Sequence, residues 1–268
     1  MMMATYVISD IHGCFDEFQT MLDKIKLSES DRLILAGDYI DRGKQSLEML
    51  RWLELCPANI TPIKGNHDAE FVENVRIMRQ IDKAEELMTD PDSNEDAKVL
   101  YDSVQYTLKR KAGAALSYYD YYGTMAVLLE QKGVTFGELC RWADMLESFL
   151  FFYRFPMNGR DCIVVHAGFC EEELAVKGSY SCREEFFLYA REDALEIGGV
   201  RNGLIIAGHT PTIAKGTKFY TDGEVFRYHE KDRDCVFYDI DCGCAYYERY
   251  PSATMVCLRL EDEEVFYL

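Results

Sequence analysis

The chain has 268 residues, of which 48% are hydrophobic and 28% are charged, an ordinary composition for one large globular domain. Its net charge of −18 opposes association with duplex nucleic acid, which is also a polyanion. No apolar run approaches the ~18 residues of a membrane span, and the first residues lack the basic and apolar regions of a signal peptide. We therefore expect a cytoplasmic protein without a membrane partner.

The first part of the chain alternates short apolar runs with segments of helical periodicity. Strands are predicted at Thr5–Ser9, Arg32–Ala36 and Ile60–Ile63. Amphipathic helices are predicted between them, at about Asp16–Lys24 and Gln45–Leu55. A helix that separates two strands returns the chain to the starting edge of the sheet, so the strands run parallel. The pattern predicts an α/β fold.

Polar residues follow each of these three strands. Asp10 and His12 follow the first strand, Asp38 follows the second after 28 residues, and Asn66 follows the third after another 28. The carboxyl ends of neighbouring parallel strands meet at one edge of a sheet, where open α/β sheets bind ligands. The loop Gly37–Gly43 also holds two carboxylates within a few residues, and these repel each other unless a cation or another partner lies nearby. A metal site is predicted there.

The middle of the chain has a different character. A helix is predicted from Asp68 to about Gln80, and a turn-rich, aromatic stretch follows. Thr135 and Glu138 fit a capping box that opens a helix reaching about Ser148. We expect one domain, residues 1–268, with a helical insertion at about 81–148. Four tyrosines of the insertion either contact a substrate or pack the insertion onto the sheet: Tyr118, Tyr119, Tyr121 and Tyr122.

The second half is rich in strands. Asn158-Gly159 lies between two apolar runs, Phe151–Phe155 and Cys162–Val165, and predicts a β-hairpin. A helix at Glu184–Leu195 and a strand at Leu204–Ala207 follow. A run of antiparallel strands is then expected in a second, mixed sheet, at Tyr220–Tyr228, Val236–Ile240, Thr254–Leu260 and Val265–Leu268.

Four of the five histidines lie in one sequence context, an apolar strand followed by a loop that contains glycine. One such histidine would be explained by a structural role. Four of them, with aspartates and an asparagine at equivalent positions, indicate a metal site instead. Nitrogen and oxygen ligands without thiolate suit manganese, iron or zinc. The four histidines are His12, His67, His166 and His209.

Five sequence blocks together resemble the signature of the calcineurin-like metallophosphoesterases, in the branch of the phosphoprotein phosphatases. The tract Gly37–Glu48 is similar to Ser/Thr phosphatases, and bacterial diadenosine tetraphosphatases share the His67-Asp68 and His166-Ala167-Gly168 blocks. The resemblance implies a four-layer α-β-β-α sandwich of two mixed sheets flanked by helices. The blocks are Asp10–Gly13, Gly37–Gly43, Gly65–Asp68, His166–Gly168 and Gly208–Thr210.

The resemblance also implies two divalent metal ions, with manganese favoured and iron or zinc as alternatives. It assigns Asp10, His12 and Asp38 to one ion. It assigns Asp38, Asn66, His166 and His209 to the other, so that Asp38 is shared. Two such ions clamp the phosphoryl oxygens and lower the pKa of a bridging water, giving a hydroxide that attacks the phosphorus.

Four further residues receive catalytic roles from the resemblance. His67 is the general acid for the leaving oxygen, with Asp41 holding its imidazolium. Arg42 binds the nonbridging phosphoryl oxygens as a bidentate fork. The family uses a second arginine before the last histidine, and we assign it to Arg191. Arg183 and Arg201 are the alternatives.

The function implied is a metal-dependent phosphoesterase, with a Ser/Thr protein phosphatase acting on phosphoproteins as the first expectation. The alternative is a bis(5'-nucleosyl)-tetraphosphatase acting on dinucleoside polyphosphates. The metal-site blocks do not separate the two, because the surrounding loops select the leaving group. A nuclease is disfavoured by the negative charge, and an inactive regulatory module would lack a ligand. The sequence indicates neither the oligomeric state nor a protein partner.

Overall fold

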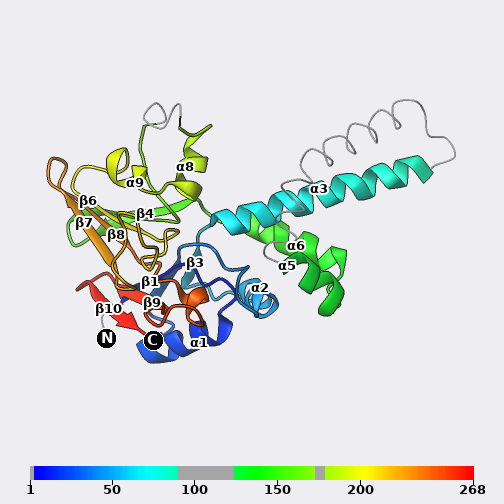
Figure 1. Cartoon of the computed structure of the whole chain (residues 1–268), viewed down its shortest axis with the longest axis horizontal. Helices are drawn as coiled ribbons and strands as arrows, with labels where there is room; N and C mark the ends of the chain where they lie inside the picture. Colours follow the sequence, from blue (N-terminus) through cyan, green and yellow to red (C-terminus); the bar gives the residue numbers. More distant parts are fainter. Residues whose placement is uncertain (1–2, 90–123, 173–178) are drawn as a thin grey trace. The chain divides into compact units, whose positions relative to one another are not determined.

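The computed structural model describes residues 3–89, 124–172 and 179–268 (Figure 1). The chain forms two compact units, one made of Met1–Asp68 with Ser148–Leu268 and the other of Ala69–Glu147. Every residue predicted for the metal and phosphate site belongs to the first unit. The second unit begins at Ala69 rather than at 81, and the assignment of the chain to a single domain stays a prediction.

The first sheet has the strand order β10-β9-β1-β2-β3. Its centre consists of β1 (Thr5–Ile8), β2 (Arg32–Leu35) and β3 (Ile60–Pro62), which are parallel, as predicted. The helices α1 (Phe15–Ile25) and α2 (Ser46–Glu54) connect them. All three strands thus end at the same edge of the sheet, which confirms the expected α/β arrangement.

The second sheet has the order β4-β5-β6-β8-β7. The predicted hairpin is confirmed, since Asn158 and Gly159 both have positive φ angles, of 51° and 74°, as a two-residue hairpin turn requires. The inner strands β5, β6 and β8 are parallel, and β4 and β7 are antiparallel edge strands. The bounds are Phe152–Met157 for β4, Arg160–Val165 for β5, Gly203–Ala207 for β6, Phe226–Glu230 for β7 and Cys235–Asp239 for β8.

The last two strands correct the prediction for the tail. β9 (Val256–Arg259) and β10 (Glu264–Tyr267) belong to the first sheet, where β9 pairs antiparallel with β1. Their placement in the second sheet was wrong, because strand pairing depends on contacts distant in sequence. The predicted strand Tyr220–Tyr228 was also wrong in its extent, since only its end lies in β7 and turns precede it.

A further correction concerns the predicted helix Glu184–Leu195. The structure has two short helices, α8 (Arg183–Tyr189) and α9 (Asp193–Glu196). They are separated at Ala190, whose ψ of 139° is extended, and the backbone N–H of Arg191 donates to Asp193 Oδ1 over 2.8 Å. This break takes Arg191 out of a regular helix.

The two sheets pack face to face around one apolar cluster. Strand residues such as Val7 and Ile34 meet Val164 and Ile206 of the other sheet, and all are buried. On the outer face of the second sheet, Phe186 of α8 packs in a second cluster. The helices α1 and α2 lie beside the first sheet, with α8 and α9 beside the second (Figure 1). The predicted four-layer α-β-β-α sandwich is confirmed.

The second unit is helical where the structure describes it. It includes most of α3 (Asn66–Thr89), then α5 (Thr124–Ala126), a π-helical turn (Val127–Gln131) and α6 (Phe136–Glu147). The capping box is confirmed, because Thr135 and Glu138 exchange side-chain to backbone hydrogen bonds of 2.8 and 3.2 Å. The four tyrosines of the insertion, Tyr118, Tyr119, Tyr121 and Tyr122, lie outside the described residues. Among described helices, none is long and apolar enough to cross a membrane.

Candidate metal centre

The loops that follow β1 and β2 adopt an unusual backbone conformation. Asp10, His12, Asp38, Asp41 and Arg42 all have positive φ angles, between 46° and 72°. This region is sterically unfavourable for residues with a side chain, and such strain concentrates at functional sites. The two loops also support each other, since the backbone N–H of His12 donates to the carbonyl of Asp38 over 2.8 Å. The strain is therefore held in place by the hydrogen bonds between the loops.

Asp38 lies at the centre of the cluster and is buried. Its Oδ2 atom lies 3.4 Å from His12 Nε2, 3.5 Å from His166 Nε2 and 3.9 Å from His67 Nε2. Burial alone would raise the pKa of Asp38, but the neighbouring imidazoles of His166 and His67 lower it well below its usual range when they are protonated. One carboxylate thus faces three imidazoles and is positioned to be shared between two ions.

Asn66, His166 and His209 converge on a second point. Asn66 Oδ1 lies 2.9 Å from His166 Nε2 and 3.0 Å from His209 Nδ1. His166 Nδ1 donates to the carbonyl of Ala36 over 2.9 Å, which leaves the Nε2 lone pair directed at the cluster. His12 is oriented in the same way, because its Nδ1 donates to the carbonyl of Ile40 over 2.8 Å. Outer hydrogen bonds of this kind fix the tautomer of a metal-ligating histidine.

Two buried polar atoms of the cluster support a metal site. Asp10 Oδ1 and His209 Nε2 have no hydrogen-bond partner within the described part of the chain, although buried polar groups are nearly always paired. Burial is the largest cause that lowers the pKa of both His12 and His209 well below the ordinary value, and the charge of Arg42 lowers that of His12 further. Both imidazoles are thus neutral, the form that binds a cation. The donor set fits divalent ions.

The geometry and the predicted ligand set differ at one position. Three ligand atoms approach one another in the groups His12, Asp38, His67 and Asp38, His166, His209. The second group agrees with the prediction, whereas the first contains His67 where Asp10 was expected. We retain Asp10, because its Oδ1 lies 3.9 Å from His12 Nε2 and has no hydrogen-bond partner among the described residues. In contrast, His67 Nδ1 is paired with Asp41, and His67 Nε2 contacts Arg42.

His67 lies between a carboxylate and a guanidinium. Its Nδ1 lies 2.6 Å from Oδ2 of the buried Asp41, and its Nε2 lies 3.0 Å from Arg42 Nη2. Burial lowers the pKa of His67, but the charge of Asp38 and the hydrogen bond to Asp41 outweigh burial, and the net shift is upward. A protonated imidazole held by a carboxylate can donate a proton to a leaving oxygen.

Arg42 lies at the edge of the cluster. Its two terminal nitrogens contact the ring nitrogens of His12 and His67, and its guanidinium carbon lies 5.5 Å from the centre of the Tyr246 ring. The aromatic ring stabilises the cation by a cation–π contact. The guanidinium of Arg42 therefore lies at the edge of the position that a phosphoryl group would occupy.

Of the three candidates for the second arginine, Arg191 alone contacts a site loop. Its Nη1 donates to Thr210 Oγ1 over 3.3 Å, next to His209. Arg183 instead donates to the carbonyl of Glu171 over 2.7 Å. Arg201 precedes β6, whereas His209 follows that strand, so they lie at opposite ends of it. This placement supports Arg191 as the second phosphate-binding residue.

Replacing Arg191 by alanine is expected to lower kcat/KM about tenfold, mainly through KM. A hydrogen bond to a charged group contributes about 1.5–3 kcal/mol, and the exposure of this side chain reduces that value. Steady-state kinetics on an aryl phosphate provide the measurement, with Arg183→Ala as the matched control. An equal loss in the two variants would remove the assignment of Arg191.

Asp68 is a residue whose role the sequence did not reveal. Its carboxylate accepts hydrogen bonds from the backbone N–H groups of Asp38, Tyr39 and Gly65, over 2.9, 3.1 and 2.8 Å. Burial, followed by the charge of Asp38, raises its pKa to about 7. Asp68 therefore positions the loop that carries Asp38. From the sequence, Asp68 could be recognised only as an acidic residue in the first turn of a helix, a pattern that indicates where a helix begins.

Two more buried carboxylates lie at the end of β8, those of Asp239, its last residue, and Asp241 in the loop that follows. The backbone N–H of Asp241 donates to Asp239 Oδ1 over 3.0 Å. Burial, followed by the charge of Asp10, raises the pKa of Asp241 well above its usual value. Close approach also explains one glycine of the site, since a Cβ on Gly208 would lie 2.0 Å from Asp10 Oδ2.

Comparison with known proteins agrees with this site. The model of the calcineurin-like phosphoesterase family matches residues 3–238. The symmetrical bis(5'-nucleosyl)-tetraphosphatase of Haemophilus ducreyi is 42% identical over 94 residues, which are 34% of this chain and 35% of that protein. The enzyme of the same name from Vibrio campbellii is 38% identical over 97 residues, or 35% and 36% of the two chains. The chain thus spans about a third of the length of these relatives.

A structural comparison agrees at the level of the fold. A crystal structure provisionally described as a diadenosine tetraphosphatase aligns with a TM-score of 0.54 over 99% of this chain and 92% of that one. Its sequence identity is 15%, so the similarity shows the fold alone. Because the family model covers most of the chain and the expected fold is present, the chain belongs to the calcineurin-like metallophosphoesterases and is a hydrolase.

Proposed function

We propose that this metallophosphoesterase hydrolyses dinucleoside polyphosphates, with a bis(5'-nucleosyl) tetraphosphate cut symmetrically into two nucleoside diphosphates. The observation that carries the proposal is the similarity to relatives named symmetrical bis(5'-nucleosyl)-tetraphosphatase. This activity was the alternative prediction from the sequence. Hydrolysis of phosphoserine or phosphothreonine, the first expectation, ranks second because it rests only on the tract Gly37–Glu48.

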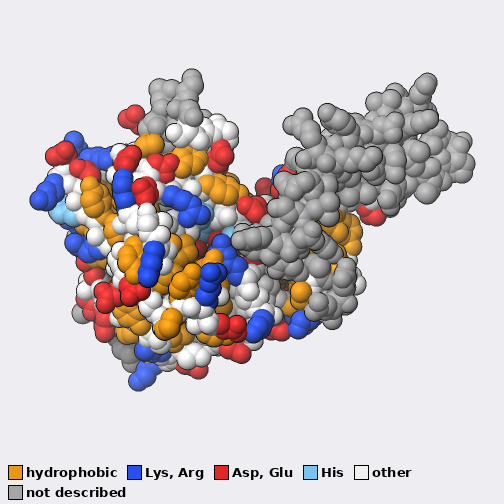
Figure 2. All heavy atoms as spheres, in the orientation of Figure 1, with side chains coloured by type: hydrophobic (Ala, Val, Ile, Leu, Met, Phe, Trp, Pro, Cys, Tyr) orange, Lys and Arg blue, Asp and Glu red, His pale blue; other side chains and the backbone are white. Residues whose placement is uncertain are grey.

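We propose that Asp10, His12 and Asp38 hold one divalent ion and that Asp38, Asn66, His166 and His209 hold the other, with manganese as the ion. When bound, two such ions supply Lewis acidity toward the phosphoryl oxygens and lower the pKa of a coordinated water. The described face of the first unit carries acidic and basic side chains interspersed (Figure 2). A polyphosphate bound to this acidic chain therefore relies on the local positive charge of the site.

The protein residues then divide the remaining tasks. Arg42 and Arg191 bind nonbridging oxygens and hold the phosphoryl group in line for attack. His67 gives its proton to the leaving oxygen, and Asp41 keeps the ring oriented and charged until that transfer. A nucleoside diphosphate leaves with its charge spread over phosphate oxygens, so it needs this proton less than a serine alkoxide does.

A side-by-side assay tests the proposal. Purified, manganese-loaded protein is given diadenosine tetraphosphate, a phosphoserine peptide and an aryl phosphate, and products are separated by ion-exchange chromatography. We expect the highest kcat/KM for diadenosine tetraphosphate, with two molecules of ADP from each molecule of substrate. A higher kcat/KM for the phosphopeptide would overturn the proposal in favour of the phosphatase.

A further inference from the structure

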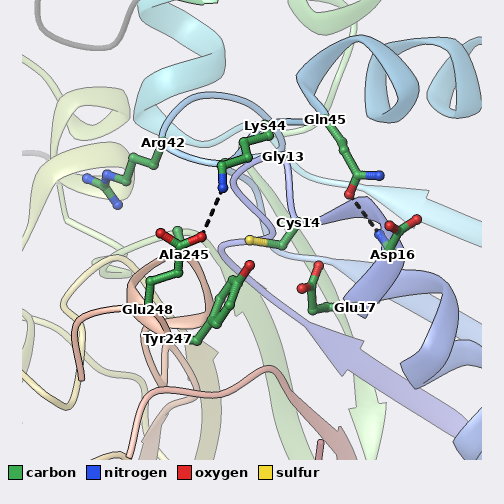
Figure 3. A pocket seen from close by; sticks show the side chains of 11 residues that line it. Gly13, Cys14, Asp16, Glu17, Arg42, Lys44, Gln45, Ala245, Tyr247 and Glu248 are labelled. Carbon is green, nitrogen blue, oxygen red and sulfur yellow. Dashed lines mark hydrogen bonds and ion pairs between the residues drawn. The ribbon is translucent and has the colours of Figure 1, made fainter. Parts of the chain in front are cut away.

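A cavity of about 390 Å³ has Arg42 of the candidate site in its wall, and Figure 3 shows the side chains that line it. Two loops with predicted site residues continue into its wall, since Gly13 follows His12, and Arg42 with Gly43 lines it directly. Successive Cα atoms are 3.8 Å apart, so the wall begins one residue after His12 in the first loop and at Arg42 itself in the second. The guanidinium of Arg42 points away from the other lining side chains, and its Nη2 lies 3.0 Å from His67 Nε2. Arg42 thus stands between the phosphoryl position and the cavity.

The charges of the wall disfavour a phosphate within the cavity. Three carboxylates line the cavity, those of Asp16, Glu17 and Glu248, against the ammonium of Lys44 and the guanidinium of Arg42, which points away from the other lining side chains (Figure 3). Carboxylates repel phosphate oxygens but accept hydrogen bonds from hydroxyl and amino groups. The wall therefore favours the uncharged end of a phosphate ester that carries several hydrogen-bond donors. A ribose with its two hydroxyls and a base with an exocyclic amino group have this chemistry.

Tyr247 supplies an aromatic surface in the same wall. Its side chain is 49% exposed, and its ring extends across the cavity toward Cys14 (Figure 3). The charges of Glu17 and Glu248 raise the pKa of its phenol, so the ring is neutral and its hydroxyl remains a donor. Stacking on an aromatic ring is sequence-tolerant, because every base has a π face. The cavity thus combines a stacking surface with acceptors for sugar hydroxyls.

Lys44 connects the cavity with the phosphates. Its ammonium lies 2.9 Å from Glu248, and both side chains are largely exposed. Exposed ion pairs contribute little to stability. Lys44 can therefore leave Glu248 and bind a phosphate oxygen when a ligand is present. It lies two residues after Arg42 in the chain.

We propose that this cavity is the nucleoside subsite of the enzyme, binding one nucleoside of a dinucleoside polyphosphate with its base on Tyr247 and its ribose hydroxyls toward Glu17. The assignment rests on the proposed function and adds the element that distinguishes a dinucleotide from other phosphate esters. It also offers a base-stacking tyrosine within the described part of the chain, at a different position from the tyrosines of the insertion.

The test compares diadenosine tetraphosphate with inorganic tripolyphosphate, which has phosphoanhydrides but no nucleoside. For Tyr247→Ala, we expect the ratio of kcat/KM for diadenosine tetraphosphate to that for tripolyphosphate to fall on the order of tenfold, the scale of one lost base stack. Tyr247→Phe keeps an aromatic ring and should retain the wild-type ratio of the two kcat/KM values. Ala245→Trp, which fills the cavity from another position on its wall, should lower that ratio. Tyr220→Ala, at an exposed tyrosine that does not line the cavity, is the matched control.

A binding measurement separates this inference from the proposed function. Adenosine is titrated into the manganese-loaded wild type and into manganese-loaded Tyr247→Ala, and its affinity is measured by isothermal titration calorimetry. Weaker adenosine binding in the variant supports the subsite even if diadenosine tetraphosphate is not hydrolysed, in which case only the proposed function fails. Equal adenosine affinity in both proteins, or an unchanged substrate ratio in an active Tyr247→Ala, overturns the subsite.

Discussion

Replacing Asp38 by alanine is expected to reduce phosphoesterase activity by a factor of at least about 10³. Its Oδ2 atom lies within 3.9 Å of ring nitrogens of His12, His67 and His166, and among the described residues it is the one carboxylate that both ligand groups contain. Metal ions contribute several kcal/mol of charge stabilisation in a transition state. Each 1.4 kcal/mol corresponds to about tenfold in rate, so losing the shared ligand has a large effect.

The measurement is kcat/KM on an aryl phosphate at saturating manganese, with the melting temperature recorded in parallel. Asp232→Ala, at an exposed aspartate on the same unit, is the control and should retain the activity of the wild type. Chelation of the wild type should reproduce the loss, and also lower its melting temperature, because buried ligands that bind an ion only in the folded state stabilise that state. A folded Asp38→Ala variant with activity near that of the wild type would contradict the shared role.

Replacing His67 by asparagine is expected to lower the rate by about 10²–10⁴, the range of general acid catalysis. Its Nδ1 lies 2.6 Å from Asp41, and the net upward shift of its pKa favours the protonated ring. The loss should depend on the leaving group. A phosphoserine peptide, whose alkoxide must be protonated, should lose more than an aryl phosphate or diadenosine tetraphosphate.

This dependence distinguishes proton donation from a structural role. The rates of wild type and His67→Asn are compared on aryl phosphates of increasing leaving-group pKa, and the variant should show the steeper decline. Asp41→Asn is the companion variant, with a smaller loss in the same direction, since the ring remains while its orienting carboxylate is gone. Parallel declines in wild type and His67→Asn would show that His67 positions the substrate or binds metal instead.

The sequence predicted the site edge of the first sheet because the required information is periodic. The equal spacing of Asp10, Asp38 and Asn66 follows from two consecutive βα units of equal length, and the observed parallel pairing of β1, β2 and β3 brings their ends together. The Asn158-Gly159 hairpin and the Thr135 capping box were predictable for a similar reason. Each depends on residues only a few positions apart.

The features that the sequence did not predict are nonlocal. The strand β9 pairs with β1 across almost the whole chain, a contact that no local sequence pattern specifies. The break at Ala190 places Arg191 at the site, yet the segment has ordinary helical periodicity. The role of Asp68 depends on three N–H groups that only the folded loops bring together. The cavity beside Arg42 likewise joins the α1 start to the loop after β8.

The metal content of three purified proteins tests the central claim, a shared two-metal centre in which His67 is a proton donor. Wild type, Asp38→Ala and His67→Asn are loaded with manganese, desalted and analysed by inductively coupled plasma mass spectrometry. The account predicts two ions per chain in the wild type and in His67→Asn, and fewer than two in Asp38→Ala. Two ions retained in Asp38→Ala, or an ion lost from His67→Asn, would contradict it.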